Sequence, residues 1–269
     1  MEKVLVLAPH ETYMLRAISD YSRVSNLSFV IVGSKKIIDE ISKKHMLRLK
    51  NTEVIDIPGE VEIALFAASY IEKQKIKFII LGDIPSAYHQ KIINVQNDLV
   101  GMVNVVDTLI KDEYIFISSG SKYNHADFED KKKAVLQASE VMSQLGIKYI
   151  NASLVFPKKK ADNIESKIIK MLIKDLDIKN LNITDYKSLK EIFALKEPDI
   201  NLIVMKNYDL TKMFIDSLDI FTDSKVCTLL LHNGKIIIDT YESDNYKNLF
   251  FSLFIVDKLI EKRVLSKVS

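Results

Sequence analysis

The sequence predicts an α/β protein in which short apolar strands alternate with amphipathic helices along nearly the whole chain. Hydrophobic residues make up 48% and charged residues 28% of the 269 residues, which is the balance of a globular chain. That length suits one large α/β domain or two lobes of about 130 residues each. The short apolar runs are followed by stretches of helical apolar spacing, the pattern of parallel strands joined by helices.

The first half of the chain repeats this alternation four times. Strands are expected, with helices between them, over residues 3–7, 29–32, 52–57 and 78–81. Ser34 is the predicted N-cap of the helix after the second strand. Residues 103–106 and 114–118 predict two more strands. The gap between them is short, which favours antiparallel pairing because a parallel crossover needs a dozen or more residues.

The second half continues with helices and ends in a hairpin. A long helix is predicted over residues 127–145, closed by Gly146 at its C′ position. Asn233-Gly234 lies between two apolar runs and predicts a tight hairpin turn. The remaining elements are expected to be strands over 149–155, 200–205, 226–231 and 235–238, and helices over 162–175, through Leu218 and over 245–263.

Composition and motifs exclude several kinds of function. The net charge is only +2, from 38 basic and 36 acidic residues, so we expect neither a nucleic-acid nor a membrane partner. The chain has seven glycines and neither G-x-G-x-x-G nor G-x-x-x-x-G-K-[ST], so it offers no Rossmann fingerprint and no P-loop. H-E-x-x-H and C-x-x-C are absent and the five histidines are scattered, so we expect no metal and no bound cofactor.

Three local features concern location and reactivity. The apolar run after Met1 is too short for a signal peptide, and no stretch approaches about 18 uncharged residues, so a cytoplasmic protein is expected. Cys227 lies in an apolar run, which favours a buried hydrophobe over a reactive thiol. The lysine runs 131–133 and 158–160 are typical of solvated helix starts or loops, with contact to an anion or to CoA phosphates as the alternative.

Several strings resemble the phosphate acetyl/butyryltransferase family. Residues 9–11 (Pro-His-Glu) and 15–18 (Leu-Arg-Ala-Ile) are similar to that family's first strand and helix, and residues 32–41 to its second strand and following helix. The block 114–156 is the best matched, and residues 199–260 keep the family's spacing of strand, helix, hairpin and last helix. The resemblance covers nearly the whole chain.

The resemblance implies a two-lobe α/β architecture, with mostly parallel sheets flanked by helices, like that of isocitrate and isopropylmalate dehydrogenases. One lobe would comprise residues 1–124 and 240–269, the other residues 125–239, with a cleft between them. The resemblance also implies a homodimer that moves an acyl group between coenzyme A and inorganic phosphate. Such chemistry needs donors for an anion, a group that holds phosphate and a base for the CoA thiol.

The same resemblance assigns six residues to the site. Two are catalytic, with the aspartate as the base: Thr240 and Asp244. Four would bind the phosphate or acyl group: Ser118, Ser119, Tyr241 and Lys212.

The motifs also depart from the family's pattern. Tyr241 stands where the family has an arginine, and a phenol supplies one neutral hydrogen bond in place of a charged fork. Leu81 stands where the family has a lysine, and Ser118-Ser119 where it has Thr-Asp. Thr211-Lys212 stands where the family has Gly-Asn.

These departures leave two functions open: an active acyltransferase, or a catalytically silent paralogue that binds CoA or acyl-phosphate or pairs with an active subunit. Asp244 is alternatively an N-cap of the last helix. Residues 118–121 form either an anion nest or a hydroxyl-rich loop. A dehydrogenase of the same broad fold is a third option, but it needs an arginine set. The four arginines lie outside the candidate motifs: Arg16, Arg23, Arg48 and Arg263.

Overall fold

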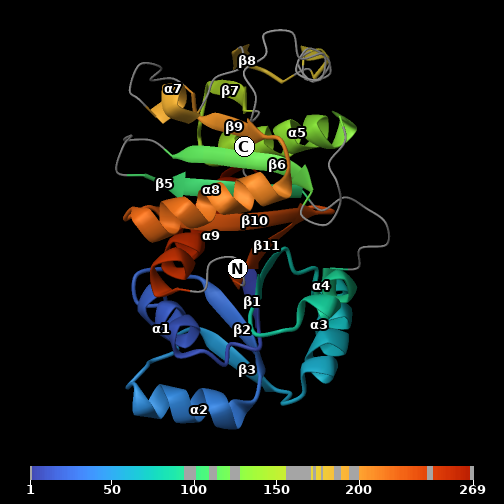
Figure 1. Cartoon of the computed structure of the whole chain (residues 1–269). Helices are drawn as coiled ribbons and strands as arrows, with labels where there is room; N and C mark the ends of the chain where they lie inside the picture. The colour runs from blue at the N-terminus through green and yellow to red at the C-terminus, as the bar shows by residue number, and fades with distance from the viewer. Residues whose placement is uncertain are drawn as a thin grey trace. The chain divides into compact units, whose positions relative to one another are not determined.

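The computed structural model describes residues 2–93, 101–108, 114–121, 128–155, 171, 174–176, 178–184, 189–193, 200–240 and 245–266. The described chain alternates strands and helices, which confirms the predicted α/β class (Figure 1). It divides into two compact units, Met1–Asp98 with Cys227–Ser269, and Leu99–Val226. The lobe boundaries expected from the resemblance, after residues 124 and 239, stay a prediction.

The first unit is built on a sheet with the strand order β3-β2-β1-β4-β11-β10. The first five strands in that order are parallel to one another, and β10 runs antiparallel to β11. Residues 4–7 of β1 are fully buried, as expected of an apolar strand that is covered on both faces of the sheet. The strands are β1 (Lys3–Leu7), β2 (Ser28–Gly33), β3 (Thr52–Asp56), β4 (Phe78–Leu81), β10 (Lys225–His232) and β11 (Lys235–Asp239).

Helices cover both faces of this sheet. Figure 1 shows α1 and α2 on one side and α3 and α4 on the other, and α9 packs against α1. Ser34 caps α2 as predicted, accepting from the Ile37 N–H at 3.5 Å, whereas α4 was not predicted. The helices are α1 (Thr12–Tyr21), α2 (Lys35–Lys44), α3 (Glu60–Gln74), α4 (Ser86–Ile93) and α9 (Tyr246–Ser266).

The predicted hairpin joins β10 to β11. Asn233 and Gly234 both have positive φ, 46° and 71°, the requirement of a type I′ turn. The antiparallel register that follows pairs His232 with Lys235 and Leu231 with Ile236. The turn prediction is confirmed.

The second unit is built on a sheet with the order β5-β6-β9-β7-β8. β5 and β6 are antiparallel, as their short connection predicted, and the pairs from β6 to β8 are parallel. β8 was not predicted. The strands are β5 (Gly101–Asp107), β6 (Ile115–Ser121), β7 (Ile150–Val155), β8 (Leu181–Thr184) and β9 (Leu202–Met205).

Three described helices belong to this unit: α5 (Phe128–Gln144), α7 (Leu189–Phe193) and α8 (Tyr208–Phe221). Ile215 and Leu218 of α8 pack into a core with Ile117 of β6 and Ile203 of β9. Gly146, with a φ of 88°, ends α5 as predicted. The predicted helix over 162–175 lies mostly outside the described residues, and α7 was not predicted.

Candidate functional site

The strand order of the first unit creates a topological switch point. The chain runs outward from β1 to β3 and then returns to the other side of β1 with β4. In open α/β sheets, ligands bind outside the carboxyl ends of the strands at such a point. The residues that follow these strand ends are therefore the first place to look for a site.

A strained backbone segment marks this point. Ala8 has a φ of 43°, in the left-handed region that costs a residue with a Cβ roughly 1–2 kcal/mol. Its carbonyl accepts from the N–H of His10 at 2.9 Å and of Asp83 at 3.1 Å. Gly82 allows this close approach, because a Cβ there would lie 2.1 Å from the Leu7 carbonyl oxygen. The fold thus draws the ends of β1 and β4 tightly together.

His10 and Asp83 are two titratable residues that this segment brings together. Asp83 is an exposed residue by its accessible surface, but its carboxyl group is partly desolvated. This desolvation, followed by the charge of Glu11, raises the pKa of Asp83, against the opposing influence of His10 and of the backbone N–H groups of His10 and Glu11. The Nε2 of His10 is buried and has no hydrogen-bonding partner among the described residues. Neither side chain was assigned to the site from the sequence, although residues 9–11 carry part of the resemblance.

Thr240 follows β11 and lies beside the same strand end. It is 3% exposed, and its hydroxyl donates to the carbonyl oxygen of Leu81. The proton of Thr240 is therefore committed to the backbone in this structure. Tyr241 and Asp244, also assigned to the site, lie outside the described residues. The last helix is capped by Asn245, whose Oδ1 accepts from the Asn248 N–H at 2.8 Å.

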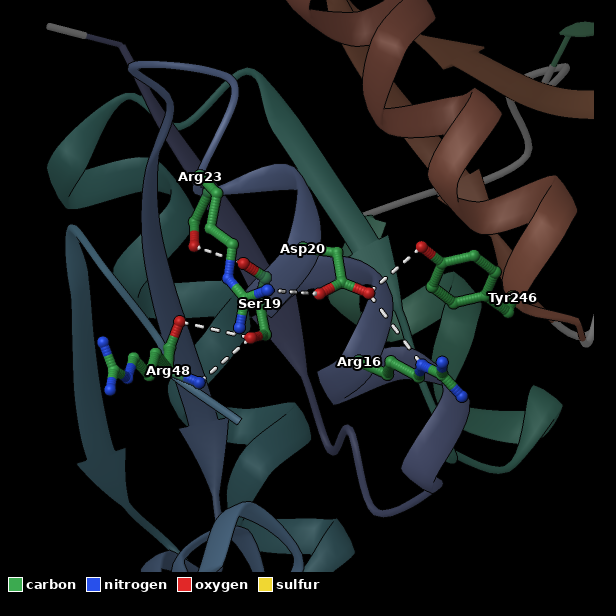
Figure 2. A network of polar contacts seen from close by, with 7 residues as sticks. Arg16, Ser19, Asp20, Arg23, Arg48 and Tyr246 are labelled. Atoms are coloured by element: carbon green, nitrogen blue, oxygen red, sulfur yellow. Dashed lines mark hydrogen bonds and ion pairs between the residues drawn. The ribbon is translucent and has the colours of Figure 1, made fainter. Parts of the chain in front are cut away.

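The start of α9 is held by a polar network on the surface of α1 (Figure 2). Tyr246 donates its hydroxyl to Asp20 at 3.1 Å, and the guanidinium of Arg16 lies 5.5 Å from its ring centroid. Arg16 and Arg23 both reach the Asp20 carboxylate, at 3.9 and 3.4 Å. The network fixes the residues directly after segment 241–244 and engages two of the chain's few arginines.

In the second unit, Ser118 and Ser119 lie near the carboxyl end of β6. Both are fully buried. The Ser118 hydroxyl donates to the Met102 carbonyl at 2.7 Å, whereas the Ser119 hydroxyl has no partner among the described residues. Among Ser118, Ser119 and Thr240, the described structure therefore leaves only the Ser119 hydroxyl without a hydrogen bond.

Lys131 is a functional candidate that the sequence named only as part of the run 131–133, with anion contact as the alternative to a solvated run. It is only 3% exposed, and its ammonium donates to the carbonyls of Ser119 and Met205, the latter at 3.1 Å. The prediction of a solvated lysine run is therefore wrong for this residue. The helical spacing of the sequence could have indicated its burial. Lys131 shares one face of α5 with the buried Ala134, Val135 and Ala138.

Lys212, also assigned to the site, lies in the first half of α8. Its ammonium forms an ion pair with Asp216, one helical turn later, at 3.1 Å. The neighbouring Thr211 is fully buried and donates its hydroxyl to the Asn207 carbonyl at 2.9 Å. The hydroxyl of Thr211 therefore serves the first turn of α8, and the charge of Lys212 is partly offset by a carboxylate.

Metal-ligating side chains and the single thiol are the remaining candidates for chemistry. The described part of the chain holds no group of three or more His, Cys, Asp or Glu side chains able to bind a metal ion. Burial raises the pKa of the Cys227 thiol to about 12, so Cys227 is a buried small side chain, as predicted. None of the helices in the described ranges is long and apolar enough to span a membrane.

Comparison with known proteins supports the resemblance found in the sequence. No family model matches the chain. A curated relative, the phosphate butyryltransferase of Clostridium beijerinckii, is 24% identical over 152 residues, which cover 54% of this chain and 50% of that protein. The match therefore spans about half the length of the curated relative.

Solved structures extend the similarity to the whole fold. A branched-chain phosphotransacylase from Enterococcus faecalis superposes with a TM-score of 0.74, at 16% identity, over 96% of this chain and 99% of that one. The EutD phosphotransacetylase from Staphylococcus aureus gives 0.70, at 11% identity, over 95% and 94%. The resemblance to the phosphate acetyl/butyryltransferase family is therefore confirmed, in sequence over about half the chain and in fold over nearly all of it.

Proposed function

We propose that this protein transfers an acyl group between coenzyme A and inorganic phosphate. The observation that carries the proposal is the full-length fold match to a branched-chain phosphotransacylase, which covers 96% of this chain. The strand ends at which such a fold places its chemistry carry the hydroxyls of Ser119 and Thr240. We further propose that the protein acts in the cytoplasm, and that it is a homodimer, as the family resemblance implies.

The chemistry requires an acid or base for the CoA thiol, a group that binds phosphate, and hydrogen-bond donors or positive charge for the oxyanion. A phosphate oxygen attacks the thioester carbon, the tetrahedral oxyanion collapses, and CoA leaves as a thiolate that takes up a proton. Asp244 is the proposed proton carrier, and it takes the thiol proton in the reverse direction. Tyr241 contributes a neutral hydrogen bond to the phosphate, and Ser119 donates its uncommitted proton to an anionic oxygen. Lys212 adds positive charge from α8.

A thiol-release assay tests the proposal. Acetyl-, propionyl- or butyryl-CoA is mixed with the protein, with and without inorganic phosphate, and free CoA thiol is measured. We expect phosphate-dependent release with a kcat above about 1 s⁻¹ for at least one acyl chain. No turnover with any of the three thioesters would contradict the proposal. The buried Cys227 thiol adds little background because burial raises its pKa to about 12.

A silent paralogue is the second candidate, favoured by a specific set of residues. Tyr241 stands where the family's pattern has an arginine. The hydroxyls of Ser118 and Thr240 already donate to backbone carbonyls. Such a protein would bind CoA or acyl-phosphate, or pair with an active subunit, without turnover. It would be stabilised against heat by CoA in large excess over its Kd, by about 2.7 kcal/mol at a hundredfold excess. Phosphate-dependent turnover would exclude this candidate.

A further inference from the structure

The buried hydroxyl of Ser119 is the starting point. Its side chain is fully buried, and its oxygen has no hydrogen-bonding partner among the described residues. A polar group removed from water without a partner is destabilising, so buried hydroxyls in folded proteins nearly always have one. Ser119 sits at the carboxyl end of a strand that is parallel to its neighbour β9, where α/β sheets place ligands. A bound ligand would supply the missing partner.

Positive charge lies at the same place. The buried ammonium of Lys131 donates to the carbonyl of Ser119 itself and to that of Met205, at the end of β9. These two bonds tie α5 to the ends of β6 and β9 and fix the backbone that carries the Ser119 hydroxyl. The charge acts in a buried setting, where it interacts with an anion more strongly than it would in water and is less screened by salt.

We propose that Lys131 and Ser119 form the phosphate-binding subsite of this protein, with the ammonium supplying its positive charge. The inference rests on the proposed function for the identity of the anion. A lysine offers a compact point charge and no bidentate fork, so the subsite selects phosphate by charge and by the Ser119 hydrogen bond. Sulfate, of similar shape and charge, is expected to compete.

Two variants and two matched controls test this subsite. Ser119→Ala removes the hydroxyl, and Lys131→Met removes the ammonium while keeping most of the side-chain length. Ser153→Ala is the control for the first, because Ser153 in β7 is equally buried and also has no partner among the described residues. Lys133→Met is the control for the second, since Lys133 lies on the exposed side of α5. Each protein is examined by phosphorus NMR titration with inorganic phosphate, by kinetics and by thermal unfolding.

Ser119→Ala is the decisive variant. We expect the KM and the Kd for inorganic phosphate to rise at least tenfold, while the KM for acyl-CoA changes less than twofold. Its melting temperature should not fall, because the variant removes a buried hydroxyl that has no partner in the ligand-free protein. Lys131→Met should weaken phosphate binding more strongly, and both controls should bind phosphate like the native protein. A hydroxyl with only a structural role would change stability without changing the phosphate Kd.

The outcomes separate this inference from the proposed function. If the native protein turns over acyl-CoA with phosphate, and Ser119→Ala does so with an unchanged phosphate KM, the subsite is wrong and the function stands. If the native protein binds phosphate without turnover, catalysis is wrong, and the Kd values of Ser119→Ala and Ser153→Ala decide the subsite. If the native protein does not bind phosphate at all, both are overturned. Failure of Lys131→Met to fold leaves the decision to Ser119→Ala.

Discussion

At the scale of single residues, the surroundings of Asp83 at the switch point of the first unit change the pKa of its carboxyl group. Its carboxylate faces the backbone N–H groups of His10 and Glu11, which favour ionisation, but partial desolvation and the charge of Glu11 outweigh them and raise its pKa. An acid whose pKa is raised by folding stabilises the fold only while protonated. Its contribution is present at low pH and is lost as the pH rises from 3.8, the ordinary value, through the raised value.

Asp83→Asn should therefore be slightly more stable than the native protein at pH 7, because solvent screens much of the effect at this exposed position, and the difference should vanish as the pH falls below 3.8. The amide oxygen can still accept from the two backbone N–H groups, so the change isolates the charge. Thermal unfolding at pH 7 and pH 3.5 measures the difference. Asp223→Asn, at an exposed position away from His10 and Glu11, is the control and should match the native protein at both pH values. A loss of stability at pH 7 for Asp83→Asn would show that the carboxylate is instead favoured by its neighbours.

At the scale of elements, Gly82 sets the distance between the ends of β1 and β4. Replacement by alanine would place a Cβ 2.1 Å from the Leu7 carbonyl and 2.7 Å from that of Ala8, and backbone atoms cannot swing aside as side chains do. We expect Gly82→Ala to lower the free energy of unfolding by about 2 kcal/mol.

The matched control for Gly82 is Gly33, at the end of β2. A Cβ at Gly33 would meet its nearest atom, the Cδ of Pro9, at an ordinary 3.5 Å. Gly33→Ala should therefore change the free energy of unfolding by less than about 0.5 kcal/mol. Urea unfolding of both variants measures the contrast. Equal stabilities would mean that the two strand ends are not held together through Gly82.

Elements with a strong local signal were predictable from the sequence. Local sequence signals predicted three features that the structure confirms: the strand β1, the Ser34 cap of α2 and the Asn233-Gly234 turn. The strand β8 (Leu181–Thr184) is partly polar and short, and α4 (Ser86–Ile93) has weak periodicity, so tertiary packing rather than local pattern defines them.

The candidate site was less predictable, because strand ends meet only in three dimensions. The family resemblance identified Ser118, Ser119 and Thr240. The sequence did not indicate which of their hydroxyls donate to backbone carbonyls, as those of Ser118 and Thr240 do. Lys131 was hidden in a run of three lysines, and only its burial on α5 distinguishes it from Lys133. His10 and Asp83 are far apart in the sequence and are joined by the parallel pairing of β1 with β4.

At the scale of the whole molecule, the similarity in fold extends over more of the chain than the similarity in sequence. The fold of phosphotransacylases is retained over nearly the full chain at only 16% identity to one of them, because apolar strands and helix faces tolerate exchange among hydrophobic residues. Polar positions tolerate exchange less, and Tyr241 and Leu81 replace charged residues of the family's pattern. Function is decided at such positions rather than by the fold. Within the second unit, the buried ammonium of Lys131 supplies positive charge to the proposed subsite.

The most direct test of this account is the identity of the product formed from acyl-CoA and inorganic phosphate. Phosphorus NMR of the native protein with butyryl-CoA and phosphate follows phosphate and acyl phosphate together, while free CoA thiol is measured in the same sample. We predict an acyl-phosphate resonance that grows in equal amount with the released thiol. Thiol release without acyl phosphate would mean hydrolysis, and neither product, with any acyl chain from acetyl to butyryl, would contradict acyl transfer by this chain.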